Sequence, residues 1–151
     1  MKYFLFAFLL VGFFACSDDD LSSEDRLAQD IETIEEYLAE NNITDAIQDP
    51  SGLFYVIDET GNGNSPTLAS EVIVNYRGFF LDNGDTFDEN DNIEFPLTGV
   101  IVGWQIGIPK LEVGGKGRLY VPSGLAYGPS GRGSIPGNAI LGFDVELLGF
   151  Q

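Results

Sequence analysis

Apolar residues recur at every second position in several short runs between residues 51 and 151, and this alternation restricts the fold more than any other feature. A period of two is typical of strands that bury one face. A single segment of this region, in which the run 100–104 is followed by Gln105, Ile106 and Gly107, is instead typical of one short helix. The pattern therefore predicts an α+β fold in which an antiparallel sheet of five to six strands curls around one short helix. The predicted strand runs lie within residues 53–58, 71–80, 86–88, 93–97, 119–121 and 141–147.

Trp104 is the only tryptophan of the chain and follows an apolar run directly. A ring of this size is costly to leave in water, so it is usually buried. Two interpretations of its position are open at this point. The ring either fills the core or forms the floor of a binding pocket.

Composition excludes several classes of function. The 151 residues carry a net charge of −17, which argues against a surface that neutralises nucleic-acid phosphates. The chain has no histidine, so histidine-based metal sites and histidine-based nucleophilic catalysis are ruled out. Cys16 is the single cysteine, and no disulfide can form within one chain. We expect neither a cofactor nor a metal.

The first residues are typical of a secretory signal that is removed from the mature protein. Lys2 precedes an apolar run that extends to residue 14 and is too short to span a bilayer. Ala15 and Cys16 then resemble the lipobox of bacterial lipoproteins, in which the cysteine is acylated, for example with palmitate. This resemblance implies a signal peptide at 1–15 and a lipid-anchored protein of the cell envelope, on the periplasmic or surface face of the outer membrane. The alternative is an ordinary signal peptide with an incidental cysteine.

An acidic tether and an amphipathic helix are predicted next. Residues 16–23 contain three consecutive aspartates, which act either as a solvated linker or as an address that resembles the surface-export signal of some bacterial lipoproteins. Residues 24–41 place apolar side chains at spacings of four, three and four, which predicts a helix. Its apolar stripe packs either on the main domain or on a second copy, and its shortness favours the domain. Residues 42–50 are predicted to be a linker.

The acidic stretch from Asp82 to Asn92 invites comparison with a calcium-binding loop. When Asp88, Asn90 and Asn92 are aligned with the first ligands of an EF-hand, Ile93 falls where the required glycine belongs. The match fails, and we predict no metal site here.

Five separated motifs together resemble one known family. In order along the chain they are Val-Asn-Tyr-Arg-Gly at 74–78, Thr-Phe-Asp at 86–88, Val-Ile-Val-Gly-Trp at 100–104, Ala-Tyr-Gly at 126–128 and Phe-Asp-Val-Glu-Leu-Leu at 143–148. Their order and spacing are similar to those of the FKBP-type peptidyl-prolyl cis-trans isomerases, the macrolide-binding immunophilins. The resemblance covers residues 51–151, and it implies a half-wrapped antiparallel sheet with an apolar pocket between its concave face and a short helix.

Carried over position by position, the resemblance implies a set of site residues. Trp104 would lie beneath the substrate proline, Tyr127 and the backbone N–H of Ile101 would donate hydrogen bonds to substrate carbonyls, and Ile135 would close the rim. Ile93 stands where the family often has a second pocket aromatic. The implied catalytic residues are Tyr76, Phe87, Asp88, Trp104, Tyr127 and Phe143, and the implied substrate-binding residues are Ile93, Val100, Ile101 and Ile135. Without the family match, Tyr76, Phe87 and Phe143 would be interpreted as core residues.

The implied function is catalysis of rotation about X-Pro bonds in exported or envelope proteins, with a macrolide such as rapamycin as a possible ligand. The chemistry suits the composition, because rotation breaks no covalent bond and needs neither a nucleophile nor a metal. The alternative is a binding module that keeps the FKBP scaffold, within an envelope or motility complex, and has incidental activity.

Overall fold

The computed structural model describes residues 21–151. The predicted signal peptide, the predicted lipidation site at Cys16 and most of the predicted acidic tether lie outside the described residues. Within residues 21–151, no helix combines the length and the apolar character that crossing a membrane requires.

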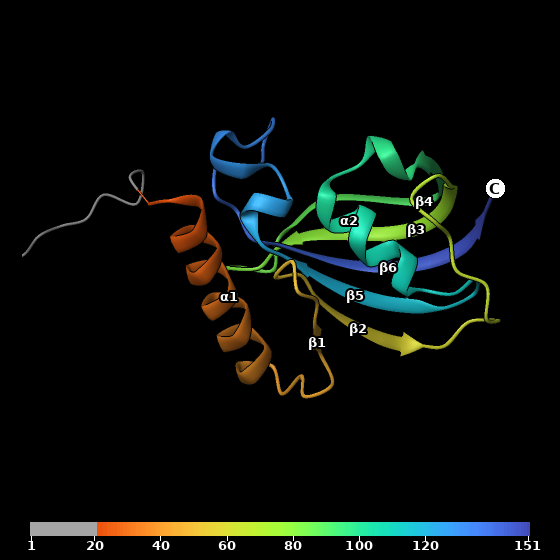
Figure 1. Cartoon of the computed structure of the whole chain (residues 1–151), viewed down its shortest axis with the longest axis horizontal. Coiled ribbons are helices and arrows are strands. Elements are labelled where there is room, and N and C mark those ends of the chain that lie inside the picture. The colour runs from red at the N-terminus through yellow and green to blue at the C-terminus, as the bar shows by residue number, and fades with distance from the viewer. Residues whose placement is uncertain (1–20) are drawn as a thin grey trace, which may run out of the picture.

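A six-stranded antiparallel sheet forms the body of the molecule (Figure 1). Its strands follow the order β1-β2-β5-β6-β3-β4, and each neighbouring pair is antiparallel. The predicted fold class is therefore confirmed. The strands are β1 (Ile47–Gln48), β2 (Phe54–Glu59), β3 (Glu71–Phe80), β4 (Thr86–Pro96), β5 (Lys116–Val121) and β6 (Leu141–Phe150).

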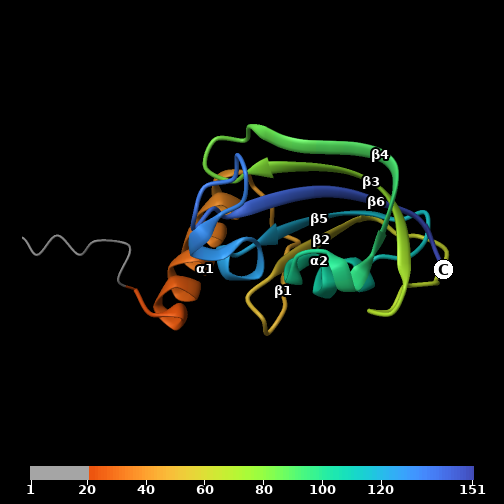
Figure 2. The same cartoon turned by 90° about the horizontal axis from the view of Figure 1, so that it is seen from above.

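The short helix α2 (Val102–Gly107) lies against one face of the sheet, as Figure 2 shows from above. Two glycines allow the close approach. A Cβ atom at Gly103 would lie 2.4 Å from a methyl group of Val121, and one at Gly107 would lie 2.7 Å from a methyl group of Leu119. The main core, which includes Trp104 and Leu119, fills the space between this helix and the sheet.

Helix α1 (Ser23–Glu40) packs at one end of the sheet (Figures 1 and 2). It begins after Ser22, whose hydroxyl accepts a hydrogen bond from the backbone N–H of Asp25 at 3.1 Å. Ile34 and Leu38 are buried in a second apolar cluster that includes Tyr120. Because successive residues of a strand point to opposite faces, Tyr120 lies on the face opposite to Leu119 and α2. The predicted amphipathic helix is confirmed, and its stripe contacts the domain of the same chain.

One buried carboxylate connects α1 to the rest of the domain. Asp30 is 3% exposed, and its Oδ2 accepts hydrogen bonds from the backbone N–H and the hydroxyl of Ser123, at 2.8 and 2.6 Å. Ser123 opens the long segment that connects β5 with β6. The helix thus holds that segment in place through a contact between two residues that are 93 positions apart in the sequence.

Two segments outside the predicted strands and helices contain local order. Residues 42–50 include β1, which pairs with β2 through Ile47 and Gln48. The segment 122–138 includes short 3₁₀ turns and a tight hairpin in which Arg132 and Ile135 exchange backbone hydrogen bonds of 2.9 Å. Both features depend on pairing rather than on an apolar period, so the sequence pattern carries no signal for them.

Candidate active site: an aromatic pocket between the sheet and helix α2

Trp104 forms the base of an aromatic cluster on the face of the sheet that α2 covers. Its ring is 4% exposed and meets three others edge to face, with centroid distances of 5.2 Å to Tyr76, 5.8 Å to Phe95 and 5.5 Å to Phe143. Such perpendicular contacts are a favourable geometry for aromatic rings. The indole N–H has no hydrogen-bond partner among the described residues. Trp104 is therefore both a core residue and part of a pocket wall.

A hollow of about 240 Å³ opens above this cluster. Its size is close to the lower end of the range typical of small-ligand sites. Strands β3, β4 and β6, the start of α2 and the segment before β6 all contribute to it. The lining residues are Tyr76, Phe95, Gly99, Val100, Ile101, Trp104, Tyr127, Arg132 and Phe143.

Phe87 and Asp88 are neighbours in sequence, yet both contact residues on the pocket face. On a regular strand they would point to opposite faces. The ladder between β3 and β4 shifts here, because Gly78 pairs with Asp88 while Phe79 pairs with Thr86. Phe87 is the extra residue of a β-bulge, a device that re-aims a side chain next to functional sites. The bulge directs Phe87 toward the pocket face together with Asp88.

Gly78 makes room for the Phe87 ring. A Cβ atom at this position would lie 2.5 Å from Cζ of Phe87 and 3.0 Å from Phe143. The two rings meet edge to face with centroids 5.8 Å apart. Phe87 contacts Phe143 at the wall of the cluster, but it does not itself line the hollow.

Asp88 does not line the hollow, but it is hydrogen-bonded to Tyr76, which does. The Tyr76 hydroxyl donates to Oδ2 of Asp88 at 2.5 Å, and the amide of Asn90 donates to the same hydroxyl at 3.3 Å. Burial, followed by the hydrogen bond to Asp88, raises the pKa of Tyr76 to about 12. The phenol therefore stays protonated at neutral pH and holds the carboxylate in place.

A second bulge on β4 sets the register of these groups. Val74 pairs with Ile93, whereas Tyr76 pairs with Asn90, so β4 carries one extra residue between them. Asn92 lies there with a φ of 52°, a left-handed conformation that asparagine tolerates. Ile93 packs against the main core without lining the hollow.

Besides the Trp104 indole, further hydrogen-bond donors at the pocket have no protein acceptor within residues 21–151. The backbone N–H of Ile101, which precedes the first turn of α2, makes no hydrogen bond there. Tyr127 is half-buried, and its hydroxyl is likewise unpaired in the described part of the chain. Donors of this kind can hold the carbonyl oxygens of a bound peptide.

The pocket differs in part from the expected set of residues. Among those expected, Tyr76, Val100, Ile101, Trp104, Tyr127 and Phe143 line the hollow. Ile135 is 9% exposed and belongs to the core, where it anchors the hairpin at Arg132. Phe95 and Arg132 line the hollow and were not anticipated as site residues. Phe95 follows Ile93 by two positions, and this alternation is the signal that could have identified it.

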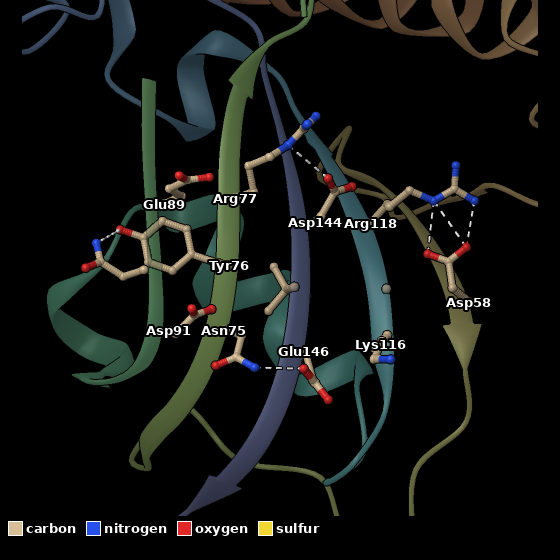
Figure 3. Close-up of a pocket in the computed structure, with 13 residues that line it drawn as sticks. Asp58, Asn75, Tyr76, Arg77, Glu89, Asp91, Lys116, Arg118, Asp144 and Glu146 are labelled. Carbon is tan, nitrogen blue, oxygen red and sulfur yellow. Dashed lines mark hydrogen bonds and ion pairs between the residues drawn. The ribbon is translucent and has the colours of Figure 1, made fainter. Parts of the chain in front are cut away.

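A larger hollow, of about 690 Å³, lies on the other face of the sheet (Figure 3). Its two arginines are already engaged with carboxylates of the same lining. Arg77 contacts Asp144 at 3.2 Å, and Arg118 contacts Asp58 at 2.7 Å. The smaller aromatic hollow is the better candidate for a peptide site, because it offers apolar walls and unpaired donors together.

Comparison with known proteins identifies the family. A family model described as FKBP-type peptidyl-prolyl cis-trans isomerase matches residues 63–148. The chain is 41% identical over 121 residues to the FKBP-type isomerase FkpA of Aeromonas hydrophila, across 78% of this chain and 45% of that protein. For FkpA of Escherichia coli K12 the identity is 43% over 102 residues, or 65% and 37% of the two chains.

Solved structures show the same relationship. The crystal structure of Escherichia coli FkpA superposes with a TM-score of 0.74 and 35% identity, covering 85% of this chain and 62% of that one. A peptidyl-prolyl isomerase from Pseudomonas syringae superposes with a TM-score of 0.74 and 28% identity, over 87% and 98% of the two chains. This chain spans less than half the length of the curated FkpA relatives it matches. The chain belongs to the family of FKBP-type peptidyl-prolyl cis-trans isomerases.

Proposed function

We propose that this protein accelerates the cis-trans rotation of X-Pro bonds in other polypeptides. The observation that carries the proposal is the hollow above Trp104, in which aromatic walls stand next to two unpaired donors, the Ile101 N–H and the Tyr127 hydroxyl. Membership of the FKBP-type family supports the same function. The curated FkpA relatives are longer than this chain, so the proposal concerns the activity of this domain.

The proposed mechanism uses binding alone. Rotation about the X-Pro bond is slow because the twisted amide loses its resonance, at a cost of about 20 kcal/mol. The twisted amide has less charge separation than the planar one, so an apolar cavity favours it over the ground state. Fixed donors hold the flanking carbonyls during the rotation. An acceleration of about four orders of magnitude requires only about 5.4 kcal/mol.

Each residue has a defined role in this proposal. The proline ring rests on Trp104 between Tyr76 and Phe143, and Phe87 supports Phe143 from outside the hollow. Tyr127 and the backbone of Ile101 donate to carbonyl oxygens, while Asp88 is oriented by Tyr76 toward the twisted amide. Val100 and Phe95 line the hollow as substrate-binding residues, and Ile93 and Ile135 support that wall from the core.

An isomerisation assay on a proline tetrapeptide tests the function. We expect the protein to accelerate the relaxation from cis to trans in proportion to its concentration. A folded protein that gives no acceleration would contradict the proposal and would favour the alternative, a binding module that keeps the scaffold. Rapamycin is the ligand for a second measurement. Because Trp104 is the single tryptophan, its fluorescence should change when the pocket is filled.

We further propose that the protein is a lipoprotein of the cell envelope. The sequence of residues 1–23 supports this proposal, with a signal peptide at 1–15, acylation at Cys16 and a tether at 16–23 that leads to helix 24–41, linker 42–50 and the isomerase domain at 51–151. Its clients would be exported proteins that contain proline. Labelling of growing cells with a fatty-acid analogue should mark the protein, and a Cys16→Ser variant should remain unlabelled. Equal labelling of both would exclude Cys16 as the acylated residue.

A further inference from the structure

Arg132 is the charged member of the pocket lining. It stands at the base of a tight hairpin, where its backbone N–H and carbonyl both pair with Ile135 at 2.9 Å. Gly133 supplies the positive φ, +60°, that the turn requires. Ile135 is buried in the core. The backbone of Arg132 is therefore held in a fixed position at the rim, although its side chain is exposed.

The guanidinium of Arg132 lies over Tyr127, with 5.8 Å between its carbon and the centre of the ring. This distance is within the range of a cation–π contact, which arginine favours on aromatic faces. Such a contact leaves the N–H groups around the edge of the guanidinium available to an acceptor. Tyr127 itself lines the hollow, so an acceptor bound by Arg132 would lie next to the peptide in the pocket.

Arg132 also differs from other cations of this acidic protein. Arg77, Lys110, Lys116 and Arg118 each form an ion pair with a carboxylate. Within residues 21–151, Arg132 forms no ion pair and no side-chain hydrogen bond. Arg132 is thus a cation at the pocket without a carboxylate partner, although the chain has a net charge of −17.

We infer that Arg132 makes the pocket select proline peptides that carry a carboxylate side chain on a residue next to the proline. The inference rests on the proposed isomerase function. Arginine suits this task because its planar fork matches both oxygens of a carboxylate. The net negative charge of the protein opposes acidic peptides, but this repulsion is screened beyond about 8 Å at physiological salt. The contact at Arg132 acts at shorter range and determines the preference.

The test compares peptides that differ only in charge. Two pairs of tetrapeptides place Glu or Gln either directly before or directly after the proline, and kcat/KM is measured for each at fixed ionic strength. In the Arg132→Gln variant we expect the Glu-to-Gln ratio of kcat/KM to fall on the order of threefold in at least one pair. The Arg132→Lys variant keeps the charge without the planar fork, and its ratio should lie between the two.

A matched control separates a local contact from a change in net charge. Lys110→Gln removes the same charge at a residue paired with Asp49 at 3.0 Å, outside the pocket lining. We expect this variant to keep the wild-type ratio. Equal ratios in wild type and Arg132→Gln would overturn the inference, and so would an equal fall in Lys110→Gln.

Failure of the proposed function would be visible separately. It would appear as absence of acceleration for every peptide by the wild-type protein. The inference would then still be decided by binding, measured through Trp104 fluorescence with the same peptides. Tighter binding of a Glu peptide than of its Gln partner, lost in Arg132→Gln, would support it, and equal affinities would refute it.

Discussion

The hydrogen bond between Tyr76 and Asp88 organises the polar side of the pocket at the scale of single residues. Its length of 2.5 Å is typical of a bond to a charged acceptor. Asp88 is exposed to solvent, so its carboxylate is accessible to a substrate as well as to Tyr76. The hydrogen bond from Tyr76 therefore fixes the orientation of the Asp88 carboxylate, which would otherwise rotate freely on β4.

We predict that Asp88→Ala lowers kcat/KM on a proline tetrapeptide by about 10- to 100-fold, because a hydrogen bond to a charged group contributes about 1.5–3 kcal/mol. The exposed position of Asp88 means that the fold should persist. Glu89→Ala removes the same charge from the adjacent exposed residue, which points to the other face, and should retain the activity. Comparable losses in both variants would contradict a specific role for Asp88.

At the scale of elements, the two bulges of β4 decide which side chains reach the pocket. The first adds Phe87 to the pocket face, and the second sets Tyr76 opposite Asn90. Helix α1 acts at a distance, because Asp30 binds Ser123 at the start of the segment that carries Tyr127 and Arg132. The bulges of β4 and the contact between Asp30 and Ser123 thus position the site residues from outside the hollow.

Gly78→Ala tests the first bulge. The added methyl group would meet Phe87 and Phe143, so we expect a loss of about 1–3 kcal/mol in the free energy of unfolding, together with lower isomerase activity. Urea denaturation and the tetrapeptide assay measure the two effects. Gly149→Ala on β6 is the control, since a Cβ atom there has no neighbour within 4 Å. Normal activity of Gly78→Ala would show that the ring of Phe87 is dispensable.

Asp30→Ala tests the brace between α1 and the segment after β5. The substitution leaves the buried N–H and hydroxyl of Ser123 without an acceptor, which costs about 1–3 kcal/mol in the free energy of unfolding. Glu32→Ala, at an exposed position of the same helix, should change it by less than about 0.5 kcal/mol. Equal stabilities of the two variants would mean that water replaces the carboxylate.

At the scale of the whole molecule, the protein combines a strongly negative net charge with two tyrosines whose pKa values are raised. Burial raises the pKa of Tyr120 to about 12, against an opposing effect of Arg118, and the pKa of Tyr76 is also about 12. In the unfolded chain both phenols titrate near 10. Each therefore contributes stability that is fully present below about pH 10 and is lost as the pH rises toward about 12.

We expect the free energy of unfolding to fall between pH 10 and pH 12. In Tyr120→Phe the fall should be shallower than in the wild type, because one titrating group has been removed. Denaturation in urea at several pH values measures the slope. Tyr37→Phe, also on the side of the sheet that packs on α1, serves as a comparison. If the free energy of unfolding of Tyr120→Phe fell with pH as steeply as that of the wild type, the contribution assigned to Tyr120 would be contradicted.

Local pattern by itself determined the two helices, the strands other than β1 and the faces that they bury, although it divided β4 into two separate runs. Period two and period 3.6 are consequences of backbone geometry, so alternation in residues 141–147 and the stripe of α1 can be recognised without the fold. The position of Trp104 after an apolar run likewise indicated a buried ring. The family motifs added the expectation of a pocket, which neither composition nor spacing would have supplied.

Only the tertiary structure decided which of these side chains meet. A bulge adds one residue to a ladder, and its position depends on the partner strand, so the side of β4 on which Phe87 lies is not a local property. Two other contacts likewise depend on the packing of distant segments, that of Asp30 with Ser123 and that of Arg132 with Tyr127. The sequence thus determines which face of each element is apolar, whereas packing over the whole chain determines the pocket, because burial and hydrogen bonding must be satisfied everywhere at once.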